Sequence, residues 1–221
     1  MEALFAGKHC FLDREEWRNL ALQLPGDKIS AQFYEKTEEF SKCLAVCPGL
    51  VKEAYALRSP DSIPEAAQVL SLLHRTIEVY DRLQQWFEGF IKFAPSPEEV
   101  MSSSRDSLYP VVYHYHNASI ATVFCSYNAT AIIFRKILME FKYADYADEI
   151  SQSVDNICKS VEYLSETGIM GPYRLGFSMR IAYEVSTITT KLWIRTWLVR
   201  LQKFYGSISL ENYPPIEVPN N

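Results

Sequence analysis

Hydrophobic residues recur along this chain at spacings of three and four, which is the spacing of amphipathic α-helices. The clearest series runs from Ile63 to Phe93. Ser62 and Glu65 have the spacing of a capping box at its start, and Pro64 is tolerated in a first helical turn. This pattern predicts a helix of about 30 residues, or about 45 Å at 1.5 Å per residue.

A second long helix is predicted from about Pro110 to Phe141. The stretch from Leu108 to Phe134 contains no Asp, Glu, Lys or Arg, and it is long enough to span a bilayer. It also carries histidine, asparagine and hydroxyl side chains, each of which is costly in lipid. We therefore predict a helix that is buried inside the protein on all sides, and no membrane span.

Shorter helical segments complete the pattern. Asp27 is a candidate N-cap for a helix that ends at Pro48. Later helices are predicted over 150–164, from Pro172 onward, and over 192–204. Period-two alternation never persists, so strands are not expected. The fold class predicted is all-α, a multi-helix bundle or array of about six to seven helices, two of them near 30 residues.

The chain has 221 residues, which fits one large domain or two small ones. Apolar residues make up 48%, which is too many for a disordered chain. We expect a single helical domain over 1–221. Its ends, 1–12 and 207–221, are expected to be flexible, and 94–107, with two prolines and three successive serines, is expected to be an internal loop.

Charge and cysteine usage narrow the class of protein. The net charge is −5 and no long Lys/Arg run exists, so we expect no direct DNA binding by this chain. Five scattered cysteines do not suggest a disulfide framework, and a reducing compartment is the simpler reading. The first twelve residues lack the apolar run of a secretory signal.

Metal-binding patterns are weak. His114 and His116 lie two apart, and on a helix such positions point to different faces. Cys43 and Cys47 are four apart and could meet on a helix, but two thiolates without two more ligands make a poor zinc site. We predict no metal site and no cofactor.

Catalytic patterns are also lacking. The sequence has no Gly-x-Ser-x-Gly elbow and no glycine-rich phosphate loop. His9-Cys10 is a lone dipeptide, and a catalytic cysteine needs a partner that the fold must place. We predict no catalytic residue and no enzymatic activity.

Charged residues in the last third of the chain can have either a structural role or a role in binding. Arg180 and Glu184 have helical i,i+4 spacing in an apolar segment, so they can pair structurally, or Arg180 can contact a ligand. The final predicted helix carries a basic row that is either a solvated face or a surface for an acidic partner. Its members are Lys191, Arg195, Arg200 and Lys203.

Several segments resemble the fungal-specific transcription factor domain, the regulatory region of fungal zinc-cluster transcription factors. The stretch from Gly171-Pro172 through Phe177-Ser178-Met179-Arg180-Ile181-Ala182 is similar to the family's Gly-Pro followed by Phe-Pro-Leu-Arg-Val-Ala. Ile157-Cys158-Lys159-Ser160-Val161 resembles Ile-Cys-Arg-Ser-Ile, and Ser107-Leu108-Tyr109-Pro110 resembles the entry to the family's long apolar helix. Trp193 falls where the family often has a tryptophan.

The resemblance implies a non-enzymatic regulatory domain in the nucleus. It would act through protein partners of the transcription machinery or through a small-molecule effector. The chain lacks the six-cysteine zinc cluster of the family, and Ser178 replaces a common proline. The residues that we single out as structural or as effector contacts are Arg180, Glu184, Trp193, Gly171 and Pro172.

An alternative reading is a standalone helical protein that binds a small molecule and has no connection with DNA. Such a protein would be cytoplasmic. Its candidate pocket is lined by four aromatic residues, namely Tyr113, Phe124, Tyr127 and Trp197.

Overall fold

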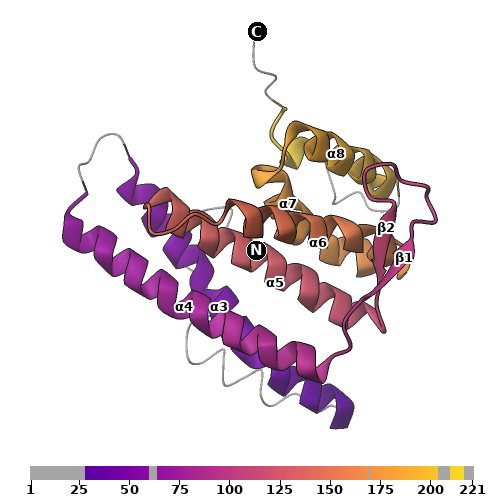
Figure 1. The fold of residues 1–221 in the computed structure, drawn as a ribbon, viewed down its shortest axis with the longest axis horizontal. Helices are drawn as coiled ribbons and strands as arrows, with labels where there is room; N and C mark the ends of the chain where they lie inside the picture. The colour runs from indigo at the N-terminus through magenta and orange to yellow at the C-terminus, as the bar shows by residue number, and fades with distance from the viewer. Residues whose placement is uncertain (1–27, 60–63, 169, 204–209, 217–221) are drawn as a thin grey trace. The chain divides into compact units, whose positions relative to one another are not determined.

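The computed structural model describes residues 28–59, 64–168, 170–203 and 210–216. Within these residues the chain forms six α-helices, one two-stranded sheet and a short 3-10 helix (Figure 1), so the predicted all-α class is confirmed. The elements are α3 (Lys28–Leu57), α4 (Ala66–Phe93), β1 (Glu98–Met101), β2 (Val111–His114), α5 (Ala118–Glu140), α6 (Ala147–Glu166), α7 (Met170–Val185), α8 (Ile188–Gln202) and η2 (Leu210–Asn212).

The chain divides into two compact units. The first comprises the chain up to Phe93 together with Ile133–Tyr146, and the second comprises Ala94–Ile132 together with the chain from Ala147 onward. The boundary therefore falls at three points: before β1, within α5 and before α6. The expectation of one domain over 1–221 stays a prediction, and its flexible segment 1–12 lies outside the described residues.

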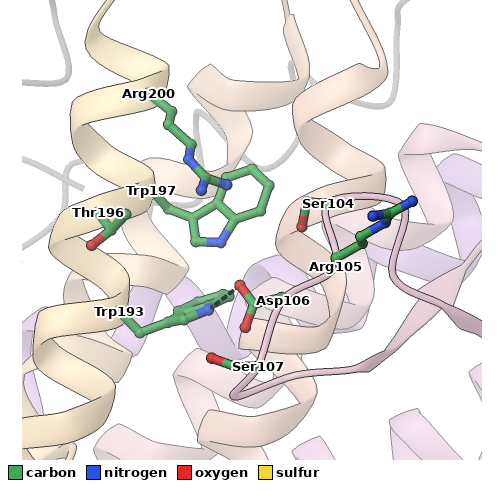
Figure 2. Close-up of a pocket in the computed structure, with 8 residues that line it drawn as sticks. All are labelled: Ser104, Arg105, Asp106, Ser107, Trp193, Thr196, Trp197 and Arg200. Carbon is green, nitrogen blue, oxygen red and sulfur yellow. Dashed lines mark hydrogen bonds between the residues drawn. The ribbon is translucent and has the colours of Figure 1, made fainter.

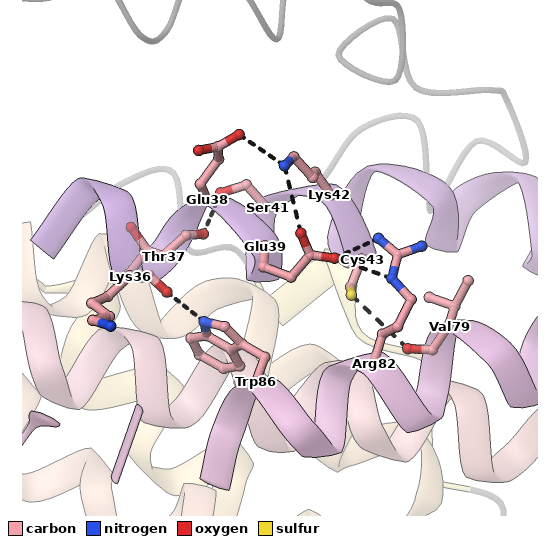
Figure 3. A network of polar contacts seen from close by, with 10 residues as sticks. All are labelled: Lys36, Thr37, Glu38, Glu39, Ser41, Lys42, Cys43, Val79, Arg82 and Trp86. Carbon is pink, nitrogen blue, oxygen red and sulfur yellow. Dashed lines mark hydrogen bonds and ion pairs between the residues drawn. The ribbon is translucent and has the colours of Figure 1, made fainter. Parts of the chain in front are cut away.

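In the first unit, α3 and α4 pack along their apolar faces. Phe40 of α3 stacks on Trp86 of α4 with ring centroids 4.9 Å apart, and Leu83 is fully buried. Polar contacts border this seam (Figure 3): Arg82 pairs with Glu39 at 2.5 Å, and the Trp86 indole donates to the carbonyl of Lys36. The apolar residues that recur with helical spacing in α4 thus form the face that packs against α3.

Helix α3 does not end at Pro48 as predicted, but continues to Leu57. Proline removes one backbone hydrogen bond from a helix and usually kinks or ends it. Here Pro48 and Leu50 are both buried, as is Ala54 one turn further on. Burial of this face offsets the lost hydrogen bond. The predicted helix end at Pro48 was therefore wrong, because tertiary packing outweighs the local effect of the proline.

The second long helix is shorter than predicted. Helix α5 has 23 residues and α4 has 28, so the expected pair of helices near 30 residues is not confirmed. Residues 111–114 form β2 instead, and β2 pairs antiparallel with β1, which lies inside the expected loop 94–107. Asn117 sets the start of α5, because its side-chain oxygen accepts the N–H of Ile120 at 2.9 Å.

In the second unit, α6 buries the face that its periodicity predicted, including Ile150, Ile157 and Leu164. Helix α6 contacts both α7 and β2. Helix α8 begins at the N-cap Thr187, whose hydroxyl accepts the N–H of Thr190. No helix in the described part of the chain is long and apolar enough to cross a membrane.

Part of the tail that we expected to be flexible is packed. Tyr213 is buried against the ring of Tyr183, with centroids 5.2 Å apart, and the Tyr183 hydroxyl donates to the carbonyl of Pro214 at 2.6 Å. The buried aromatic ring and this hydrogen bond hold Tyr213 and Pro214 against α7. The remainder of 207–221 lies outside the described residues.

Candidate functional site

The connection between β1 and β2 is a well-bonded loop over residues 102–110. Its base is closed by a hydrogen bond from the N–H of Ser102 to the carbonyl of Pro110 at 2.9 Å. Non-glycine Arg105 adopts φ of 52°, a left-handed conformation that costs free energy unless the surroundings hold it. Two carboxylates, Glu162 and Asp106, supply the bonds that hold this loop.

Glu162 of α6 receives the serine run of the loop. Its carboxylate accepts from the Ser102 hydroxyl at 2.7 Å, from the Ser103 N–H at 2.7 Å and from the Ser104 hydroxyl at 2.8 Å. Burial alone would raise the pKa of Glu162, but these hydrogen bonds stabilise the ionised form and lower the pKa to about 2. Glu162 is therefore a charged anchor for the loop at all physiological pH values.

Asp106 fixes the other half of the loop. One of its oxygens accepts from the N–H groups of Leu108 at 2.8 Å and Tyr109 at 3.0 Å, as in an Asx-turn. Its second oxygen accepts from the indole nitrogen of Trp193 on α8 at 2.5 Å. The ring of Tyr109 meets that of Trp193 edge-on, with centroids 4.7 Å apart. The loop is thereby attached to both α6 and α8.

Between this loop and α8 lies a pocket of about 260 Å³ (Figure 2). Trp197 is only 7% exposed, and its indole nitrogen has no hydrogen-bond partner among the described residues. The guanidinium of Arg200 lies over the Trp197 ring at 4.9 Å from its centroid. The lining residues come from the loop and from α8: Ser104, Arg105, Asp106 and Ser107, then Trp193, Thr196, Trp197 and Arg200.

The four aromatic residues of the predicted pocket are not brought together in this cavity. Tyr113 and Phe124 do meet, edge to face at 6.0 Å, and the Tyr113 hydroxyl donates to the side-chain oxygen of Asn156. Trp197 lines the cavity at the loop, whose lining includes neither Tyr113, Phe124 nor Tyr127. The apolar composition of α5 gave no way to distinguish a core residue from a pocket residue.

Sequence reasoning missed the loop residues of the site. Ser104 and Asp106 lie in a Ser-Ser-Ser-Arg-Asp run, whose composition predicts only a loop. The available signal was the aspartate, because Asx-turns place such side chains two residues before the N–H that they bind. Its partner Trp193 is 87 positions away, a pairing that no local pattern reveals.

Arg180 and Glu184 form the predicted helical ion pair at 2.5 Å. The Arg180 side chain is 22% exposed and that of Glu184 is 43% exposed, so water screens the pair partly. Arg180 also lies over the ring of Tyr213, 5.5 Å from its centroid. Gly171 and Pro172 lie in the first turn of α7, which begins at Met170, two residues earlier than predicted.

The described cysteines are all buried and free: Cys43, Cys47, Cys125 and Cys158. Burial raises the pKa of Cys43 to about 11 and that of Cys125 to about 12, so both are protonated at neutral pH and poor nucleophiles. His114 lies in β2, not in a helix, and its ring meets that of Tyr163. The described residues contain no group of three or more side chains able to hold a metal ion.

Comparison of the chain with protein-family models, with curated proteins and with solved structures finds no match.

The lowered pKa of Glu162 predicts an acid-sensitive loop. Because the folded pKa of about 2 is below the ordinary 4.5, this group stabilises the protein above pH 4.5 and loses its contribution as the pH falls toward 2. The full contribution is about 3 kcal/mol. Urea unfolding of the parent and of Glu162→Gln, measured from pH 7 to pH 3, should show a stability difference that shrinks with acid.

Glu166→Gln is the matched control, since Glu166 is an exposed carboxylate on the same helix. It should change the free energy of unfolding by less than about 0.5 kcal/mol at any pH. Equal effects of Glu162→Gln and Glu166→Gln would show that the loop contacts of Glu162 contribute nothing.

The partial exposure of the Arg180–Glu184 pair predicts weak coupling. A double-mutant cycle of Arg180→Ala and Glu184→Ala should give an interaction of about 0.3–0.5 kcal/mol, as for exposed helical pairs. Arg180→Ala should cost more than Glu184→Ala, because Arg180 also covers Tyr213. A measured coupling of about 3 kcal/mol or more would mean that the pair behaves as a buried one.

Proposed function

We propose that this chain is a non-enzymatic regulatory domain of the kind found in fungal zinc-cluster transcription regulators. It acts in the nucleus, through protein partners of the transcription machinery or through a small bound effector. The proposal rests on the sequence resemblance, and one structural observation supports it. Trp193 and Tyr109 of the Ser107–Pro110 segment, both part of the resemblance, meet edge-on with ring centroids 4.7 Å apart.

A third segment of the resemblance, Ile157–Val161, is packed in the core of the same unit. Cys158 is 1% exposed, and Ser160 shares a buried hydrogen bond of 2.6 Å with the Tyr115 hydroxyl. Segments of the resemblance therefore contribute buried residues to the second unit, among them Tyr109, Cys158 and Ser160. This is the arrangement expected if the resemblance reflects a common core.

The charge distribution favours partners other than DNA. The net charge is −5 and the sequence has no long Lys/Arg run, which does not favour binding to the phosphate backbone. DNA contact would belong to another module, and this chain would supply regulation. The alternative function, a standalone small-molecule-binding protein, is favoured by the pocket between the loop and α8.

A tethering experiment tests the proposal. The full chain, fused to an unrelated DNA-binding domain, should change the output of a reporter gene in fungal cells relative to that DNA-binding domain alone. Trp193→Phe should weaken the effect, because it keeps an aromatic ring but removes the N–H that binds Asp106.

The matched control is Trp86→Phe, which removes an indole N–H in the first unit. It should leave the reporter effect in place. A parent fusion that expresses as folded protein but leaves the reporter unchanged would contradict the regulatory function and favour the standalone alternative.

A further inference from the structure

Helix α8 carries a row of exposed aliphatic side chains. Ile188, Leu192 and Val199 are 43%, 55% and 46% exposed. Together with Arg195 they occupy positions i, i+4, i+7 and i+11, which form one line along a helix and have the spacing of a coiled-coil seam. Exposed apolar residues that are scattered singly need no explanation, but a row on one helix is the pattern of a face that packs against another helix. We call Ile188, Leu192, Arg195 and Val199 the α8 seam.

The α8 seam and the pocket lie on different sides of the helix. Successive residues of an α-helix are rotated by about 100° around its axis, so Trp193 is turned well away from Leu192. Figure 2 shows the rings of Trp193 and Trp197 on the side of α8 that faces the loop. The carboxylate of Asp106, which binds the Trp193 indole, therefore belongs to that side and not to the seam.

The charge along α8 is positive throughout. The helix contains Lys191, Arg195 and Arg200 and no acidic residue, and Lys203 follows as its C-cap. The ammonium of Lys191 lies over the ring of Tyr183. None of these basic side chains forms an ion pair within the described part of the chain. Because the whole chain has a net charge of −5, α8 is a local basic surface on an acidic protein.

Arg195 lies inside the seam, between Leu192 and Val199. A helix that packs on these two aliphatic residues also removes the guanidinium from water, and a desolvated charge is costly unless it is paired. A carboxylate opposite Arg195 provides the strongest partner, since it can accept two parallel hydrogen bonds from the guanidinium. The seam therefore fits an apolar helix face that carries an acidic side chain within its apolar row.

We propose that the α8 seam binds an acidic amphipathic helix of a protein partner. The apolar residues of that helix pack on Ile188, Leu192 and Val199, and one of its Asp or Glu side chains pairs with Arg195. Acidic residues beside its apolar face meet the positive field of α8. The seam is about 16 Å long at 1.5 Å per residue, which matches about three turns of a partner helix. The inference rests on the proposed function, since it names the chemistry of the partner.

Charge argues against two other occupants. A second copy of this chain would place one basic α8 against another, and such juxtaposition of like charges is unfavourable. An anionic membrane is an extended surface, which would also meet the excess negative charge of the rest of the chain. A short acidic helix avoids this repulsion, because salt screens charges beyond about 8 Å at physiological ionic strength.

The test is fluorescence anisotropy of a labelled synthetic peptide titrated with the full chain. The peptide is a helix of about four turns with leucine at the seam spacing, one glutamate within the leucine row and glutamates on both flanks. It should bind saturably, with an affinity that falls as the salt concentration rises. A second peptide, in which lysine replaces every glutamate, should bind at least about tenfold more weakly.

Paired variants locate the binding site. Leu192→Gln should weaken binding of the acidic peptide by at least about fivefold, because it removes apolar surface from the contact. Arg195→Glu should weaken it by at least about tenfold, because a like charge then faces the peptide glutamate. The controls make the same changes at exposed residues of the first unit, Leu70→Gln and Lys52→Glu, and each should change the affinity by less than about twofold. Circular dichroism checks that every variant is folded.

Three results would overturn the inference. The first is the absence of saturable binding of the acidic peptide, and the second is equal weakening by Arg195→Glu and Lys52→Glu, which would show a general charge effect. The third is another occupant of the seam. A dimer of the chain in sedimentation that Leu192→Gln dissociates would assign the seam to a second copy. Binding to phosphatidylserine–phosphatidylcholine vesicles but not to the peptide would assign it to a membrane.

The tethered reporter separates this inference from the proposed function. An active reporter together with no peptide binding would refute the role of the seam and leave the regulatory function in place. Saturable peptide binding together with a silent reporter would support the seam and contradict the regulatory function.

Discussion

The buried carboxylate of Glu162 is the constraint on which the rest of the candidate site depends. It accepts hydrogen bonds from Ser102, Ser103 and Ser104. These bonds stabilise the ionised carboxylate and lower its pKa to about 2. A buried charge is tolerated only when its hydrogen-bonding capacity is filled. Here the serines of one loop fill the hydrogen-bonding capacity of the Glu162 carboxylate, which favours one position of the loop on α6. These bonds offset the cost of the left-handed conformation of Arg105.

Once the loop is held at its serines, Asp106 can attach its far end to α8. The bond from Trp193 to Asp106, at 2.5 Å, and the edge-on ring contact with Tyr109 complete a three-way junction of loop, α6 and α8. Trp197, one helical turn beyond Trp193, lines the pocket between the loop and α8. The pocket is thus a consequence of how the loop is fixed.

Features of the fold that depend on local periodicity could be predicted from the sequence. The apolar faces of α4 and α6 and the all-α class followed from i, i+3, i+4 spacing. The prediction that a helix ends at Pro48 was wrong, because burial of the following turns lets α3 continue past the proline. The predicted helix from Pro110 was wrong over 111–114, where the chain pairs as a strand. Of the site, the sequence points to Trp193 and Trp197 but not to Asp106, the loop residue that binds Trp193. The contact of Asp106 with Trp193 spans 87 positions and depends on the whole fold.

The most direct test of this account is hydrogen exchange in the loop. The Ser103 N–H donates to Glu162 and the Trp193 indole N–H donates to Asp106, so both should exchange slowly in the parent protein. In Glu162→Gln the account predicts faster exchange at both positions together, while the Trp86 indole keeps its rate. If Ser103 exchanges faster and Trp193 does not, or if neither rate changes, Glu162 does not hold the junction and the central claim is contradicted.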